Sequence, residues 1–157
     1  MTLATRPEAR IKHVLCPVDF SERSRAASNF AVLIGEQFVA HVSLLHVAEE
    51  PSFTAPGSES GLVTVASMSR QRELKQALLE FGYRWHLVNH LVSTHVLVIT
   101  QRTVVQGIVE AARDLGASLI VMGTHARSGV GRLVYGSTTE GVMRKSSIPV
   151  LAVPQRS

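Results

Sequence analysis

Five short apolar runs alternate with longer stretches of helical periodicity, and this alternation limits the chain to very few folds. The runs occupy residues 11–16, 41–48, 95–100, 118–123 and 148–153. They are apolar at odd and even positions alike, which is typical of parallel strands buried on both faces. The order therefore predicts an α/β fold: a single doubly wound, five-stranded parallel sheet, Rossmann-like, with helices on both faces.

The stretches between the runs predict four helices. From Glu22 to about Phe38, and again over residues 68–85, apolar side chains recur every three or four positions, as on one helix face. Thr103 predicts the N-cap of a third helix, Gly116 predicts its end, and a short fourth helix precedes the last run. The side chains expected to face inward on the first two helices are Ala26, Ala27, Phe30, Leu33, Ile34, Phe38, Met68, Leu74, Leu78, Phe81 and Trp85.

The composition predicts one globular domain over residues 11–154, with tails at residues 1–10 and 155–157. The sequence is 45% hydrophobic and 18% charged, which excludes a disordered chain. No apolar run approaches the roughly 18 residues that cross a membrane, so we expect no membrane partner. Residues 1–10 lack the apolar segment of a signal peptide. Cys16 is the single cysteine and fits a reducing compartment, so we expect a cytoplasmic location.

The net charge of +4 does not indicate nucleic-acid binding. Only 5% of the residues are aromatic, and the basic residues are scattered along the chain. A surface that stacks bases would interleave the two kinds of residue. We therefore expect no nucleic-acid partner and a modest positive field that attracts small anionic ligands.

Two segments that directly follow predicted strands indicate a ligand site. In a doubly wound sheet, ligands bind outside the carboxyl ends of the strands, where the winding reverses. The first segment begins with Pro17, Val18 and Asp19. The second contains Met122, Gly123, Thr124, His125, Ala126 and Arg127 and leads to Gly136, Ser137 and Thr138.

The second segment has the features of a phosphate site. Gly136 and Ser137 lie where a helix is expected to begin, so free backbone N–H groups and the positive end of the helix dipole would meet a phosphate there. The alternative is purely structural: the glycines make turns, and Ser137 caps the helix. Asp19 likewise has two interpretations, as a ligand group or as the cap of the first helix.

The remaining chemically active residues have ordinary structural explanations. Seven histidines suggest a metal, but they are dispersed. His86 and His90 share a helix face at i, i+4 spacing, yet no Cys, Asp or Glu completes a ligand set, so we expect no metal site. His125 and Arg127 would contact a phosphate or remain solvated. Cys16 is expected to be a small buried hydrophobic residue rather than a nucleophile.

Three segments resemble the universal stress protein family. They read VLCPVDFSERSRAA near the start, LLHVAEE in the second predicted strand, and LIVMGTHARSGVGRLVYGSTTEGVMRKSSIPVLAVP at the end. The similarity covers residues 11–154 and is weakest in residues 51–101. The resemblance implies a parallel sheet in the order 3-2-1-4-5, which would bring the two segments after the first and fourth strands to one crevice.

The resemblance also implies an adenine-nucleotide site. The nucleotide-binding branch of the family has a glycine, two residues, a glycine, nine residues, a glycine, and then Ser or Thr. Gly123 and the pair Gly136-Ser137 match this pattern, whereas Ala126 replaces the middle glycine, which predicts weakened binding. The implied site consists of Asp19 on the ribose, an adenine slot of Pro17, Val47 and Met122 beside Val18, and phosphate contacts from Gly123, Gly136, Ser137 and Thr138. From their place in the same segment, we add His125, Ala126 and Arg127 to the expected nucleotide site.

The function implied is that of a cytoplasmic regulatory module of the stress response that binds ATP, ADP or AMP, with Mg²⁺ accompanying ATP. The resemblance further implies a homodimer through the last strand, from Ile148 to Val153. Alternatives remain: a nucleotide-free dimeric adaptor, a slow ATPase or self-phosphorylating protein, or a relative of electron-transfer flavoproteins or nucleotide hydrolases. We expect no efficient turnover, because the phosphate segment contains no lysine and no acid–base pair is apparent.

Overall fold

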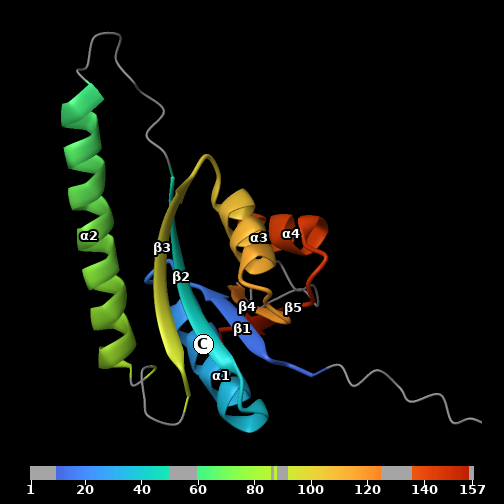
Figure 1. Cartoon of the computed structure of the whole chain (residues 1–157). Coiled ribbons are helices and arrows are strands. Elements are labelled where there is room, and N and C mark those ends of the chain that lie inside the picture. Colours follow the sequence, from blue (N-terminus) through green and yellow to red (C-terminus); the bar gives the residue numbers. More distant parts are fainter. Residues whose placement is uncertain (1–9, 50–59, 86, 88–91, 125–135, 156–157) are drawn as a thin grey trace, which may run out of the picture.

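The computed structural model describes residues 10–49, 60–85, 87, 92–124 and 136–155. Its elements follow the predicted alternation of strands and helices along the chain (Figure 1). They are β1 (His13–Pro17), α1 (Glu22–Phe38), β2 (His41–Glu49), α2 (Ser60–Arg84), β3 (Thr94–Gln101), α3 (Val104–Asp114), β4 (Leu119–Thr124), α4 (Ser137–Lys145) and β5 (Val150–Pro154).

The five strands form one parallel sheet in the order β3-β2-β1-β4-β5, which confirms the predicted fold class and strand order. β1 lies between β2 and β4, so the winding reverses at β1 and the carboxyl ends of β1 and β4 are neighbours. The first and last strands begin two residues later than the apolar runs predict. Pro17 and Pro154 end β1 and β5, respectively, instead of following them.

Two apolar layers enclose the sheet. On one face, Val14, Cys16 and Val121 pack beneath α1 and α2. On the other face, Leu15 and Ile120 pack beneath α3 and α4. The alternation of Leu15 with its two neighbours shows that β1 is buried on both sides, as its unbroken apolar sequence predicts.

Both α1 and α3 begin with a side-chain cap: Thr103 caps α3 as predicted, whereas Ser21 rather than Asp19 caps α1. The hydroxyl of Ser21 accepts a bond from the backbone N–H of Ser24, and that of Thr103 accepts one from Gln106. Gly116 has a φ of 61°, the left-handed conformation in which glycine commonly follows a helix. Val39 adopts the same conformation after α1, with a φ of 53°, although β-branched residues rarely do so.

The face of α1 that packs on the sheet differs from the predicted one. The buried residues of α1 are small: Ser24, Ala27, Ser28, Ala31, Val32 and Gly35. A Cβ on Gly35 would lie 2.6 Å from a methyl of Val42, so the helix approaches the sheet too closely for large side chains. Phe30, Leu33 and Phe38, which were expected to face inward, are therefore exposed by 50%, 58% and 47%.

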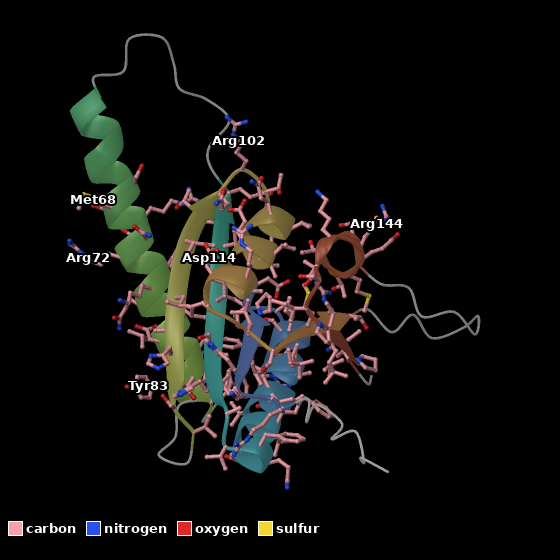
Figure 2. All side chains as sticks on the ribbon, turned by 45° about the vertical axis from the view of Figure 1, so that its right-hand side comes forward. Met68, Arg72, Tyr83, Arg102, Asp114 and Arg144 are labelled. Atoms are coloured by element: carbon pink, nitrogen blue, oxygen red, sulfur yellow. The ribbon has the colours of Figure 1, made fainter. Side chains whose placement is uncertain are left out.

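The stripe predicted for α2 is buried only in part. Leu78 and Phe81 pack into the core, whereas Met68 and Trp85, which were also expected to face inward, are exposed by 59% and 37%. Met68, Arg72 and Tyr83 all point outward along this helix (Figure 2). Among the described residues, no helix is long and apolar enough to cross a membrane.

Candidate functional site

A cavity of about 250 Å³ opens at the carboxyl ends of β1, β2 and β4, where the sequence predicts a ligand site. Seven of the predicted site residues line it: Pro17, Val18, Asp19, Val47, Met122, Gly123 and Thr138. Gly136 and Ser137 lie at the start of α4 beside this lining rather than in it. The predicted contacts His125, Ala126 and Arg127 lie outside the described residues.

The sequence reasoning missed seven further lining residues: Arg23, Ser24, Leu45, His46, Val104, Ile108 and Thr139. Some of them had a usable signal. Val104 and Ile108 are four residues apart at the start of α3, a helix that follows the carboxyl end of a strand and so begins at the same edge. Arg23 and Ser24 lie in the first turn of α1, which has the same relation to β1.

The Asp19 carboxylate is held in place by the first turn of α1. Its Oδ1 accepts bonds from the backbone N–H of Ser21, at 3.0 Å, and from the Ser21 hydroxyl. The Arg23 guanidinium lies 3.8 Å from Oδ2. Ser21 is therefore the N-cap of α1, and the interpretation of Asp19 as the cap is wrong; Asp19 instead accepts bonds from Ser21 and lines the cavity.

Asp19 is ionised at neutral pH. Burial raises the pKa of its carboxyl, but hydrogen bonds from Ser21 and Ser24 and the positive charge of Arg23 together outweigh burial and leave the pKa below its ordinary value. The Asp19 side chain nevertheless remains 62% exposed. A charged acceptor with unused lone pairs therefore faces the cavity.

His46 and Phe20 fix the segment that carries Asp19. The Nδ1 of His46 lies 2.8 Å from the carbonyl oxygen of Val18, and the N–H of Val18 donates to Leu45 at 2.7 Å. Phe20 stacks against the His46 ring with centroids 4.8 Å apart. Phe20 has a φ of 62°, so its backbone adopts a conformation that a bulky residue rarely occupies.

Gly123 has a packing role that the motif does not reveal. A Cβ at this position would lie 2.5 Å from the backbone oxygen of Arg23, so only glycine lets β4 pass this close to the start of α1. The carbonyl of Gly123 accepts a bond from the Thr139 hydroxyl at 3.1 Å. Gly123 thereby joins β4 to α1 and to α4.

The start of α4 has no side-chain cap. Gly136 is the N-cap residue, with φ −62° and ψ 153°, and it makes no capping bond through a side chain. Ser137 is the first helical residue and so does not act as the cap that one alternative assigned to it. The first backbone N–H groups of α4 therefore rely on water or a ligand for their acceptors. Among the described residues, no three His, Cys, Asp or Glu side chains are grouped to hold a metal ion.

Comparisons with known proteins find a matching family model, relatives of similar sequence and solved structures of similar fold. The model of the universal stress protein family matches residues 10–154. Universal stress protein MJ0577 of Methanocaldococcus jannaschii is 29% identical over 156 residues, which covers 93% of this chain and 96% of that protein. The fold is similar to that of the universal stress protein UspA from Lactobacillus plantarum, with a TM-score of 0.71, 21% identity and coverage of 92% and 98%.

Two further solved structures of similar fold contain nucleotides. One is a universal stress protein in complex with cAMP, with a TM-score of 0.61, 17% identity and coverage of 94% and 99%. The other is the universal stress protein from Archaeoglobus fulgidus in complex with dAMP, with a TM-score of 0.51, 17% identity and coverage of 90% and 96%. At these identities the likeness establishes the fold alone.

Proposed function

The chain belongs to the universal stress protein family, and from that premise we propose that it binds an adenine nucleotide, ATP, ADP or AMP, in the cavity beside Asp19. One observation carries the proposal: an ionised carboxylate stands at the rim of an otherwise largely apolar cavity. A carboxylate only accepts hydrogen bonds, and the hydroxyls of a ribose are donors that suit it.

The apolar lining suits the base. Pro17, Val47 and Met122 come from three neighbouring strands and line the same cavity. Ligand pockets usually have volumes of about 300 Å³ or more, so a cavity of about 250 Å³ suits a nucleoside better than a whole triphosphate. The phosphates would then extend beyond the cavity, where Mg²⁺ would accompany ATP.

The start of α4 and Arg23 support a place for the phosphates. The uncapped N–H groups after Gly136 and the hydroxyls of Ser137 and Thr138 are donors, and the helix dipole favours an anion at this end. Arg23 adds a positive charge to the lining. His125, Ala126 and Arg127 are assigned to this region by the sequence pattern alone.

We infer binding rather than efficient turnover. Among the described residues that line the cavity, Asp19 is the one carboxylate, and its Oδ1 is occupied by Ser21. Phosphoryl transfer needs a positioned base and cations around the transferred group. We therefore propose a regulatory role in the stress response, with a slow ATPase activity as the upper limit; the arrangement of the cavity and the family support this proposal. The buried free thiol of Cys16 supports a cytoplasmic location.

The second part of the proposal is a homodimer through the edge of β5. The carbonyl of Pro149 accepts a bond from the N–H of Ile120, and the N–H of Gln155 donates one to the carbonyl of Thr124. The backbone N–H and C=O groups of the odd-numbered residues therefore point toward β4. The backbone groups of Val150 and Ala152 then point to the open edge. An unprotected strand edge invites a second strand. The helix α1 contacts β5 and also carries the exposed apolar side chains of Phe30, Leu33 and Phe38.

Calorimetric titration tests the nucleotide proposal. We expect ATP to release heat and to raise the melting temperature, because a ligand that binds only the native state stabilises it. We expect GTP to do so less, since the slot is matched to adenine. No heat and no shift at millimolar ATP would favour the nucleotide-free adaptor, the alternative to which Ala126 points.

The dimer has its own test. Ala152→Pro removes an N–H from the open edge, whereas Leu151→Pro removes one that faces β4 and serves as the control for damage to the sheet. We expect the first variant to be a folded monomer and the second to be destabilised. Light scattering that still reports a dimer for Ala152→Pro would place the interface elsewhere.

A further inference from the structure

We propose that His46 is a positioning residue of the nucleotide site, which holds Asp19 at the distance and angle that a ribose requires. This inference rests on the proposed function. His46 is in the middle of β2, and neither composition nor spacing marks it as functional. The structure singles it out because it contacts the residues on both sides of Asp19.

The hydrogen bond to Val18 defines the state of the imidazole. A carbonyl oxygen can only accept, so Nδ1 of His46 carries the proton and donates to it across 2.8 Å. The N–H of Val18 is fixed from the same strand, by Leu45 at 2.7 Å. Both backbone groups of Val18 are thus held by β2, and this extends the register of the sheet one residue beyond the end of β1.

The contact with Phe20 fixes the other side of Asp19. The Phe20 and His46 rings lie 4.8 Å apart at 39°, and the Phe20 and Phe81 rings lie 6.0 Å apart at 82°. Phe20 holds a φ of 62°, a conformation that persists in a bulky residue only where the surroundings impose it. The two rings are those surroundings, and together they direct the chain from β1 into α1.

Asp19 cannot move without breaking these contacts. Its own side-chain bonds, to Ser21, run within the same turn and do not connect it to the sheet. The segment is connected to β2, whose residues Leu45 and Val47 line the cavity, by the backbone bond from Val18 to Leu45 and by the contacts of the His46 side chain with Val18 and Phe20. His46 therefore sets the position of the ribose acceptor relative to the slot for the base.

The test compares two ligands in four proteins. The ligands are ATP and 2′,3′-dideoxy-ATP, which lacks both ribose hydroxyls. The proteins are the parent, His46→Leu, His46→Asn and, as a matched control elsewhere on the sheet, His95→Asn. Asparagine retains an N–H donor close to the place of Nδ1, whereas leucine retains volume without a donor. The measured quantity is the dissociation constant of 2′,3′-dideoxy-ATP divided by that of ATP. Circular dichroism and a melting curve verify the fold.

We expect the parent and the control to prefer ATP by about ten-fold or more, the worth of a hydrogen bond to a charged acceptor. His46→Leu should lose most of that preference, and His46→Asn should regain part of it. This ratio is insensitive to a general loss of protein stability, because such a loss weakens the binding of both ligands alike. In the double variant Asp19→Asn, His46→Leu, the ratio should be no lower than in Asp19→Asn alone.

The failures are distinguishable. If the parent binds and prefers ATP, and a folded His46→Leu keeps the same preference, the role of His46 is overturned and the proposed function stands. If the parent binds neither ligand, the proposed function fails and the role of His46 fails with it. If the double variant loses a further preference beyond Asp19→Asn, His46 acts on the ligand by another route, and the positioning role is overturned.

Discussion

The two ends of the sheet treat their titratable side chains in opposite ways. At the carboxyl end, hydrogen bonds and Arg23 outweigh burial and hold the pKa of Asp19 below its ordinary value, so a charge remains beside the cavity. At the amino end, burial lowers the pKa of His13, and the neighbouring His41 and His95 lower it further, against a backbone bond to Leu115 that raises it.

The partners of the two groups explain the difference. Nδ1 of His13 donates to the carbonyl of Leu115 at 3.1 Å, and Nε2 then accepts from the Ser43 hydroxyl at 2.8 Å. Both nitrogens of a neutral imidazole are satisfied within the fold. Asp19 keeps unused lone pairs and a largely exposed side chain. His13, at the amino end of the sheet, thus has both ring nitrogens bonded within the fold, whereas Asp19, at the carboxyl end, retains lone pairs that can accept bonds from a ligand.

The largest effect should come from adding a methyl group at Gly123, where β4 and α1 pack together at the carboxyl end of the sheet. We expect Gly123→Ala to lower the free energy of unfolding by about 2–3 kcal/mol, because overpacking against backbone is not relieved by rotating a side chain. The shift of Arg23 should weaken nucleotide binding as well. Denaturant unfolding and titration measure the two effects.

Gly141→Ala is the matched control for that variant. Its Cβ would lie 2.9 Å from a terminal methyl of Val105, which can rotate, and alanine favours a helix by about 1 kcal/mol over glycine. We expect it to be near neutral. Equal stability of the Gly123→Ala protein and the parent would show that α1 does not constrain this end of the sheet.

Asp19→Ala should separate binding from folding. We expect nucleotide binding to weaken by about 1.5–3 kcal/mol, the contribution of a hydrogen bond to a charged group. The loss of folding stability should be at most about 1 kcal/mol, because Ser21 still caps α1. Calorimetry with ATP and a melting curve of the free protein give the two numbers. Unchanged affinity would remove Asp19 from the site.

The pH dependence should distinguish the two ends of the sheet without a ligand. The pKa of His13 is lower in the folded than in the unfolded protein, so the unfolded state binds more protons and stability falls as the pH drops below about 6.5. The pKa of Asp19 is also lowered, so its contribution is present above its ordinary value of 3.8 and is lost as the pH falls below that value.

A variant of His13 tests whether this histidine causes the loss of stability below about pH 6.5. His13→Asn retains a donor for Leu115 and cannot titrate, so its stability should fall less between neutral pH and pH 5 than that of the parent. We expect the effect to be smaller than that of either substitution above. Urea unfolding at several pH values measures it. Parallel pH profiles of the variant and the parent would show that His13 is not the group that titrates.

The sequence was sufficient to predict the fold and the apolar strand residues that line the cavity, for a physical reason. Apolar periodicity records burial on both faces of a strand, so residues such as Leu15 and Met122 were placed correctly. It does not record how closely two elements approach. Of the small residues that form the packing face of α1, Ala27 was predicted to face inward but Ser24, Ser28 and Gly35 were not, and Phe30 was predicted to do so from its spacing. His46 was missed because its role lies in two contacts across the sheet, which no local pattern encodes.

The smallest effect is expected where the sequence departs from the family pattern, and it bears on the phosphate side of the carboxyl end. Ala126→Gly restores the middle glycine. If nucleotide binding needs a left-handed backbone there, relief of alanine returns about 1–2 kcal/mol. Glycine has more accessible backbone conformations than alanine, and restricting them on binding costs about 0.4–1 kcal/mol. The difference should tighten ATP binding by only a few-fold, as measured by titration beside the parent. Equal or weaker binding would mean that alanine already suits the bound segment, and that the departure from the family pattern at this position does not weaken nucleotide binding.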